Sequence, residues 1–217
     1  IPVRGQLRFA GAGVRNEGRW ALRDIDLDIP AGSTLGVVGA TGAGKSTLLG
    51  LVARVRDPDA GRVLLDGHDL RTLRLADLRA SMAYVPQETL LFSMSLRDNI
   101  TLGMPAAADA QVAAAVAAAR LSNDLPQLPQ GLATVVGERG ATLSGGQRQR
   151  AAIARALVRD PQILLLDDAL SSVDAGTAAQ ILGALAADAR PRTRLVVSQR
   201  MASVRDADQI VVLDEGR

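Results

Sequence analysis

The sequence predicts an α/β fold built around a parallel sheet, and three short apolar runs carry that prediction. Leu35–Val38, Ile163–Leu166 and Leu195–Val197 consist of apolar residues and glycine, without polar alternation. Such runs are typical of strands that helices cover on both faces, as in parallel sheets. From about residue 96 to residue 158 helical periodicity takes over, which predicts an inserted α-helical subdomain.

The other elements follow in chain order. Further strands are expected at Val3–Phe9, Ile25–Ile29, Arg62–Leu65 and Ala83–Val85, the first two in an N-terminal antiparallel β subdomain. Helices are expected from about Ser46 to Val55 and from Asp109, whereas Pro126 and Pro129 break the next one. We therefore predict one domain, 1–217, with an α/β core at 1–86 and 159–217 and a mainly helical subdomain at 87–158.

The composition excludes several classes of protein. The chain has no cysteine, which rules out disulfides and thiolate metal sites, and it opens with no secretory signal. Its longest alanine-rich apolar stretch, Val112–Ala119, is far shorter than the roughly 18 residues that span a bilayer. Lys and Arg total 25 against 23 Asp and Glu, with no polybasic run, so we expect a cytosolic setting and no nucleic-acid partner.

A glycine-rich loop follows the first apolar run. It contains Lys45, the single lysine in a chain whose other 24 basic residues are all arginine. A lysine ammonium fits a cradle of backbone amides, whereas a planar guanidinium is too wide. Glycines let this backbone approach phosphates, and Ser46 would give its hydroxyl to Mg²⁺. The predicted nucleotide-binding residues are Gly39, Thr41, Gly42, Ala43, Gly44, Lys45, Ser46 and Thr47.

Two aspartates end the second apolar run. Asp167 directly follows Leu166, so we expect its carboxylate at the carboxyl edge of the sheet, where ligands of open α/β folds bind. Mg²⁺ would lie there beside the phosphates. Asp168 comes next, and the alternative is that both are solvated charges at a strand end.

A third motif, Leu143–Gln147, reads Leu-Ser-Gly-Gly-Gln. Ser144 is a good N-cap for a helix that runs to about Val158. Two glycines in the first turn of that helix cost roughly 1 kcal/mol each in helix propensity, which predicts bare amides for an anion. One chain cannot easily place this helix end and its own Lys45 on one phosphate, whereas a second chain can.

These motifs together resemble the nucleotide-binding domain of ABC transporters, over essentially the whole chain. The Walker A loop matches Gly39–Ser46, the Q-loop glutamine matches Gln87, the signature matches Leu143–Gln147, and the Walker B aspartate matches Asp167, with a D-loop at Ser171–Asp174. The resemblance implies a P-loop NTPase core of the RecA-like kind that uses ATP and Mg²⁺. The residues implied around the metal are Ser46, Gln87 and Asp167; those implied in catalysis are Asp168, Gln199 and Gln87; those implied at nucleotide are Gln87, Ser144, Gly145, Gly146, Gln147 and Asp174.

The resemblance also implies partners. In this family two domains pair head to tail, with each ATP between one Walker A loop and the other chain's signature. Val136–Gly140 looks like an exporter X-loop and Pro86–Phe92 like an exporter Q-loop. They imply docking on coupling helices of a transmembrane domain, at the cytoplasmic face of the membrane. Leu90, Leu91 and Phe92 form either an exposed patch for that partner or packing under the helical subdomain.

The departures from the family pattern bear on mechanism. Asp168 stands where the family usually has a glutamate as general base, and Gln199 stands where it has a switch histidine. A carboxylate one methylene short can cost on the order of a hundredfold in rate, and glutamine cannot become cationic. The single histidine, His68, lies far upstream in an expected surface turn. The pair resembles the degenerate half of a heterodimeric exporter, which binds ATP but hydrolyses it slowly.

Two further questions stay open on the sequence alone. The family's adenine-stacking aromatic would fall near Gly11, so Trp20 either replaces it or packs in the β subdomain. The alternatives to an exporter ATPase are a soluble ABC ATPase without transport and an ATP-sensing module that never hydrolyses. The chain stops at Arg217, where the family continues, so we expect an excised or truncated domain.

Overall fold

The structure is a computed structural model that describes residues 3–140, 142–188 and 190–217, without the side chain of Arg139. Its contacts divide the chain into two compact units. The first unit comprises Ile1–Tyr84, Pro161–Asp168 and Ala189–Arg217, and the second comprises Val85–Asp160 and Ala169–Asp188. The predicted helical subdomain, 87–158, lies in the second unit, which also includes 169–188. The α/β prediction is confirmed, since strands dominate the first unit and helices the second.

A five-stranded sheet in the first unit carries the three apolar runs. Its strand order is β6-β7-β8-β3-β9, with β3 parallel to both β8 and β9 and β7 parallel to β8. The bounds are β3 Thr34–Gly39, β6 Met82–Val85, β7 Ile163–Asp167, β8 Thr193–Val197 and β9 Gln209–Leu213. The apolar side chains of β7 and β8 are almost fully buried, as continuous apolar strands require.

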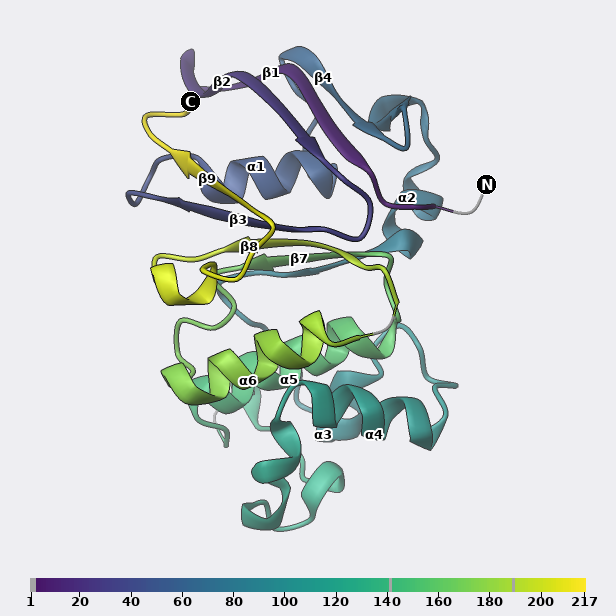
Figure 1. The fold of residues 1–217 in the computed structure, drawn as a ribbon. Helices are drawn as coiled ribbons and strands as arrows, with labels where there is room; N and C mark the ends of the chain where they lie inside the picture. The colour runs from purple at the N-terminus through teal and green to yellow at the C-terminus, as the bar shows by residue number, and fades with distance from the viewer. Residues whose placement is uncertain (1–2, 141, 189) are drawn as a thin grey trace. The chain divides into compact units, whose positions relative to one another are not determined.

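A second, antiparallel sheet has the order β2-β1-β4-β5. Its strands are β1 Leu7–Asn16, β2 Arg19–Ile29, β4 Ala60–Leu65 and β5 His68–Asp69, with the helices α1 Lys45–Val52 and α2 Leu75–Ser81 and the 3₁₀ turns η1 Leu70–Thr72 and η6 Met201–Ser203 in the same unit. Helix α1 lies between the two sheets (Figure 1) and buries Leu48 and Leu49 completely. This sandwich forms the apolar core from which the glycine loop emerges.

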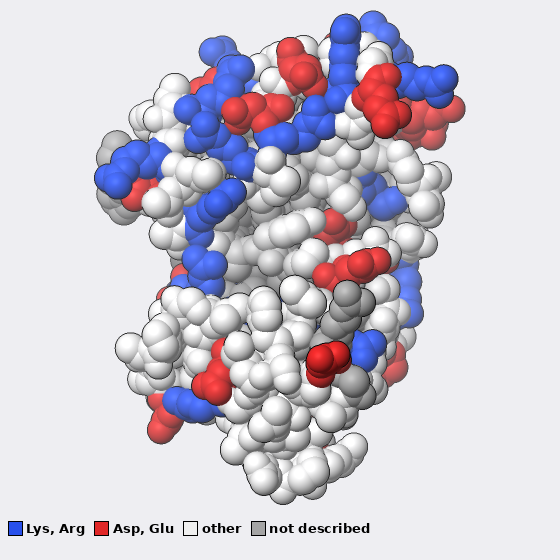
Figure 2. Space-filling view, turned by 180° about the vertical axis from the view of Figure 1, so that it is seen from behind, with Lys and Arg blue, Asp and Glu red and all other residues white. Residues whose placement is uncertain are grey.

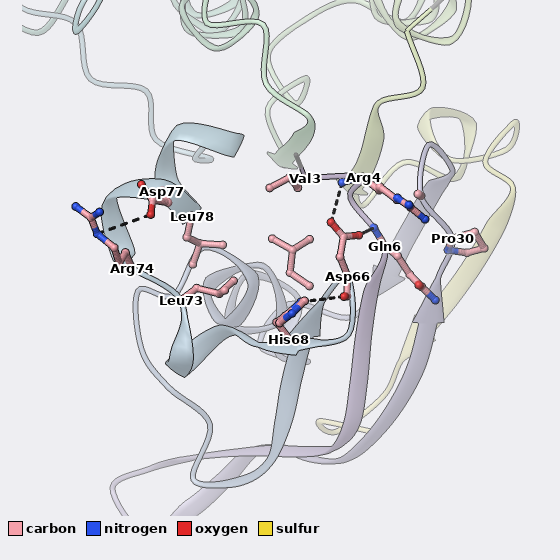
Figure 3. Close-up of a pocket in the computed structure, with 12 residues that line it drawn as sticks. Val3, Arg4, Gln6, Pro30, Asp66, His68, Leu73, Arg74, Asp77 and Leu78 are labelled. Atoms are coloured by element: carbon pink, nitrogen blue, oxygen red, sulfur yellow. Dashed lines mark hydrogen bonds and ion pairs between the residues drawn. The ribbon is translucent and has the colours of Figure 1, made fainter. Parts of the chain in front are cut away.

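The first predicted strand, Val3–Phe9, is wrong at its start, because β1 begins only at Leu7. The preceding amides do not join the sheet; those of Arg4 and Gln6 donate to the Asp66 carboxylate at 2.7 and 2.9 Å. Figure 3 shows this clamp beside a cavity of about 730 Å³. His68, also at the cavity, is exposed as predicted, although it lies in the short strand β5 and its Nδ1 is 3.0 Å from the Asp66 carbonyl oxygen.

Basic and acidic side chains intermingle over the first unit. Figure 2 shows blue and red groups interspersed across the upper part of the molecule rather than a field of one sign. Many are paired locally, as in Arg56–Asp59 at 3.2 Å and Arg71–Asp69 at 2.6 Å. Part of the arginine content of this unit is therefore balanced by carboxylates close by in the sequence.

The second unit is helical. Its helices are α3 Leu96–Ile100, α4 Asp109–Ala118, α5 Gly145–Val158 and α6 Ala175–Ala186, with 3₁₀ turns η2 Leu121–Asn123, η3 Leu125–Gln127, η4 Gly131–Ala133 and η5 Glu138–Gly140. Helices α3 and α4 pack on α5, and α4 also contacts α6. Short 3₁₀ turns occupy the stretch where Pro126 and Pro129 interrupt helical hydrogen bonding. Within the described ranges, no helix is long and apolar enough to cross a bilayer.

One buried asparagine organises the loop between β6 and α3. Asn99 is fully buried; its side-chain oxygen accepts from the Phe92 amide at 2.9 Å and its Nδ2 donates to the Phe92 carbonyl at 2.9 Å. Arg155 on α5 donates to the Asn99 backbone carbonyl at 2.8 Å and to the Leu90 carbonyl at 2.9 Å. The side chains of Asn99 and Arg155 therefore satisfy backbone hydrogen-bonding groups of this loop that no described strand pairs with.

We expect Asn99→Ala to lower the free energy of unfolding by about 2–3 kcal/mol, because it leaves buried donors and acceptors without partners. Chemical denaturation of the full chain measures the loss. Asn123→Ala, at an exposed asparagine in η2, is the matched control and should change stability by less than about 0.5 kcal/mol. Equal effects of the two substitutions would contradict an organising role for Asn99.

Candidate functional site

The glycine loop links strand β3, which lies between β8 and β9 in the sheet, to α1. Two of its glycines are required by close packing: a Cβ at Gly39 would collide with the Leu213 carbonyl, and one at Gly44 would lie 2.7 Å from the Ala21 carbonyl oxygen. Both also have positive φ, at 152° and 100°. Between them Gly42 faces open space, with nothing within 4 Å of a Cβ placed there. The loop is thus packed tightly at both ends and open at its middle.

Lys45 closes this loop from within. Only 9% of it is exposed, and its ammonium donates to the carbonyl oxygens of Gly39 at 2.8 Å and Ala40 at 2.7 Å. A lysine ammonium has three donors, so one is left for another acceptor. In the part of the chain that the structure describes, no carboxylate pairs with it. A buried cation without a counter-charge fits an anionic ligand.

The start of α1 supports the same chemistry. Gly44 is its N-cap, no described side chain caps the helix, and its first turn contains no acidic residue. The first amides of a helix lack partners inside it and carry the positive end of the helix dipole. Uncapped amides, an open Gly42 and the Lys45 cation together fit a phosphate group.

Asp167 ends β7 with only 4% of its surface exposed. Each of its carboxylate oxygens accepts one hydroxyl: Ser46 donates to Oδ1 at 3.0 Å and Tyr84 donates to Oδ2 at 2.8 Å. The predicted proximity of Ser46 and Asp167 is present in the structure. Burial and the Asp167 hydrogen bond both raise the pKa of the Tyr84 phenol above its usual range, so this side chain is a neutral donor.

The oxygens of Ser46 and Asp167 fit Mg²⁺, which prefers oxygen ligands and usually takes one or two carboxylates plus phosphates and water. Among the described residues, no cluster of three or more acidic or histidine side chains could hold a metal by itself. That is compatible with an ion bound together with a nucleotide.

Asp168 and Gln199 lie at the same sheet edge. Asp168 follows β7 with φ 47°, a left-handed conformation uncommon outside glycine, and its amide donates to the Val197 carbonyl at 3.0 Å. Gln199 is exposed two residues after β8, the neighbour of both β7 and β3. The first unit therefore brings Lys45, Ser46, Asp167, Asp168 and Gln199 to one edge. Gln87 belongs to the second unit, where it is exposed.

The Leu143–Gln147 motif forms the start of α5, as predicted. Ser144 is its N-cap, and the Ser144 and Gln147 side chains form a capping box: Ser144 Oγ accepts from the Gln147 amide at 3.2 Å, and the Ser144 amide donates to Gln147 Oε1 at 2.9 Å. Gln147 Nε2 also donates to Asp124 at 3.2 Å. Asp124 in turn forms a buried bidentate ion pair with Arg150, with a closest distance of 2.7 Å.

The predicted D-loop is tied to this helix by Gln149, which sequence reasoning missed. Gln149 is 4% exposed, donates to the Ser171 hydroxyl at 2.9 Å and accepts from the Ser172 amide at 2.8 Å. A Cβ at Gly146 would lie 3.0 Å from the Ser172 carbonyl oxygen, and one at Gly145 would lie 3.3 Å from the Ser172 Cβ. The two glycines therefore have a packing reason in addition to the anion predicted from sequence.

Asp174 ends the D-loop and caps α6. Its carboxylate accepts from the Thr177 amide at 2.9 Å, and this hydrogen bond lowers the pKa of Asp174 below its usual value. The structure therefore gives this side chain a local structural partner.

The apolar triplet after Gln87 divides. Leu90 and Phe92 are 53% and 42% exposed, whereas Leu91 is 1% exposed. Leu91 therefore packs inside the helical unit, whereas Leu90 and Phe92 remain exposed. Val135, 59% exposed, flanks the same loop through a β-bridge to Ser95. The Val136–Gly140 motif follows; the Arg139 side chain and Ala141 lie outside the described residues.

Trp20 lies on β2 opposite Arg15, whose guanidinium carbon is 4.2 Å from the indole centroid. A Cβ at Gly13 would be 2.8 Å from the indole, so the ring also lies against the β1 backbone. The next residue, Ala21, contacts the glycine loop at Gly44. Trp20 thus packs in the β subdomain, one residue before the loop contact of Ala21. Gly11, the other position considered, donates its amide to Asp26 at 2.8 Å.

Comparisons with known proteins identify the family. The protein-family profile described as "ABC transporter" matches residues 22–171. The chain is 48% identical, over 91% of its length, to an ATP-dependent lipid A-core flippase of Alkalilimnicola ehrlichii. It is 47% identical, over 90%, to the mycobactin import ATP-binding/permease protein IrtB of Mycolicibacterium smegmatis. In both cases it spans 34% of the relative, about a third of its length.

A solved structure of an ABC exporter also resembles this chain. The chain matches a bacterial Atm1-family ABC exporter with ATP bound at a TM-score of 0.96 and 41% identity, covering all of this chain and 39% of the other. The fold is accordingly that of a P-loop NTPase, with an antiparallel β sheet and a helical unit. This chain belongs to the ABC transporter family.

Proposed function

We propose that the chain is the ATP-binding motor domain of an ABC exporter, coupling ATP binding and hydrolysis to transport through a separate transmembrane domain. The observation that carries this proposal is the Lys45 ammonium, buried among neutral carbonyl oxygens beside an open stretch of loop at Gly42. Its relatives include proteins whose names specify a flippase, an import protein and a β-(1→2)-glucan export protein of Agrobacterium fabrum. We include outward transport in the proposal because of the glucan export protein and the Atm1-family exporter, although IrtB is named for import.

In this mechanism the protein mainly positions and neutralises charge. Lys45 and the amides of residues 42–47 bind the phosphates, while Ser46 and Asp167 hold Mg²⁺, which when bound neutralises charge on the transferred phosphoryl group. Asp168 accepts the proton of the attacking water and Gln199 donates a hydrogen bond to the terminal phosphate. For Gln87, in the predicted helical subdomain 87–158 of the domain 1–217, we propose the metal and water role that the family gives its Q-loop glutamine.

We further propose that this site hydrolyses slowly. The Asp168 carboxylate is one methylene shorter than the family's glutamate, and Gln199 carries no charge at any physiological pH. Two parts of the chain contact the nucleotide of a second domain that is paired head to tail with this one. They are the start of α5, with Ser144, Gly145, Gly146 and Gln147, and the D-loop with Asp174. The natural assembly is a heterodimer in which the other site turns over faster.

The membrane partner docks on the second unit. Leu90, Phe92 and Val135 expose apolar surface around one loop, which Asn99 and Arg155 hold in place. Apolar surface of this kind, rimmed by polar residues, is typical of protein contacts. The coupling helices of a transmembrane domain are the proposed occupants, which would hold the chain at the cytoplasmic face of the membrane.

Lys45→Arg should weaken ATP binding at least tenfold, because a guanidinium is too wide for the site formed by the Gly39 and Ala40 carbonyls. Isothermal titration calorimetry with Mg²⁺-ATP measures the affinity. The reverse exchange at an exposed position, Arg8→Lys, should leave affinity unchanged. ATP binding by Lys45→Arg at wild-type strength would overturn the proposed phosphate site.

Asp168→Glu combined with Gln199→His should raise the rate of single-turnover ATP hydrolysis by about a hundredfold. The longer carboxylate can then reach the attacking water, and the switch position then carries a ring that can become cationic. The reaction is followed in concentrated samples, where two copies can pair. Asp168→Ala with Gln199→His is the control and should stay slow. An unchanged rate in the Glu/His variant would favour the alternative of an ATP-sensing module that never hydrolyses.

We propose that Trp20, adjoining the loop contact at Ala21, supplies the adenine contact in place of the family's aromatic. Trp20→Ala should then lower ATP affinity by about five- to tenfold, the equivalent of about 1–1.4 kcal/mol. Affinity for inorganic triphosphate, which has no base, should not change. Equal losses for ATP and triphosphate would mean that Trp20 only packs against Gly13 and Arg15.

A further inference from the structure

The hydroxyl of Tyr84 lies at the proposed Mg²⁺-nucleotide site, although Tyr84 belongs to none of the sequence motifs. Tyr84 lies in β6, next to β7 in the sheet, and its ring is partly exposed. The hydroxyl donates to Oδ2 of Asp167 at 2.8 Å, on the opposite carboxylate oxygen from the Ser46 hydroxyl at 3.0 Å. The Asp167 carboxylate is therefore held by one donor on each oxygen.

We propose that Tyr84 is a positioning residue that orients the Asp167 carboxylate for Mg²⁺, a role that rests on the proposed ATP-binding function. A carboxylate can rotate about its terminal torsion, and hydrogen bonds to each oxygen hold it at one angle. Partners outside the metal's own ligands commonly do this, and removing them weakens metal binding.

The two donors differ in what they do when an ion binds. Ser46 would itself be a ligand of Mg²⁺, because its hydroxyl oxygen can offer a lone pair to the ion while its proton is still donated to Oδ1 of Asp167. Tyr84 sits on the other carboxylate oxygen and can remain there unchanged. Hydrogen bonds to an ionised acceptor are also stronger than neutral ones. Tyr84 is thus the donor to Asp167 that is not itself a proposed ligand of the ion, which is what a positioning residue requires.

The test separates magnesium binding from nucleotide binding. ATP affinity of the full chain is measured with Mg²⁺ and with EDTA, and the ratio is the magnesium gain. Tyr84→Phe keeps the ring and removes only the hydroxyl, so the gain should fall by roughly tenfold while affinity in EDTA stays the same. Ser33→Ala is the matched control, because it removes the hydroxyl that donates to the Pro30 carbonyl at 2.7 Å. It should leave both values unchanged.

A second measurement does not depend on how the variant folds. Tyr84 is the single tyrosine of the chain, so uniform 3-fluorotyrosine labelling gives one ¹⁹F resonance from this ring. That resonance should shift on adding Mg²⁺-ATP and move much less with ATP in EDTA. An unmoved resonance, or a Tyr84→Phe loss that is equal with and without Mg²⁺, would overturn the positioning role. A wild-type chain that binds no ATP in either buffer would overturn the proposed function itself.

Discussion

The arrangement at the sheet edge depends on one cation held by two carbonyl oxygens. Lys45 is the first residue of α1, yet its ammonium reaches back to Gly39 and Ala40, at the start of the loop that precedes it. The contact closes the loop on itself, while Gly42, between its ends, faces open space. It requires β3 to end where it does and α1 to begin without a side-chain cap. The two sheets, with α1 between them, hold both ends of that closure in place (Figure 1).

The local sequence pattern predicted those strands and helices whose position depends on residues close together in the sequence. Continuous apolar runs gave the buried strands β3, β7 and β8, and the N-cap Ser144 gave the start of α5. The pattern failed at the start of β1, where the backbone amides of Arg4 and Gln6 bind the Asp66 carboxylate, about 60 residues away in the sequence, instead of a neighbouring strand. The edge strand β9 also escaped prediction; its exposed Ile210 and Val212 resemble a surface loop as much as a strand.

The same division holds for the site. Strand–loop–helix geometry predicted where Lys45 and Ser46 lie, and the rule that parallel strands end at one edge predicted that Asp167 lies at that edge. Tyr84 and Gln149 were missed because their partners are set by strand order and helix packing, which no local pattern contains. An aromatic residue in a strand and a glutamine in a helix have many ordinary explanations. Only the three-dimensional neighbours distinguish these two.

The contact between Ser172 and the paired glycines changes what an intact motif means. Any larger residue at position 145 or 146 would press on Ser172 in the same polypeptide, with or without a nucleotide present. Both glycines therefore have a packing reason within this polypeptide that is independent of ATP chemistry. An intact Leu143–Gln147 motif is therefore evidence of a well-packed start of α5. Biochemical data are needed before it is also evidence that the chain acts on the nucleotide of a neighbouring subunit.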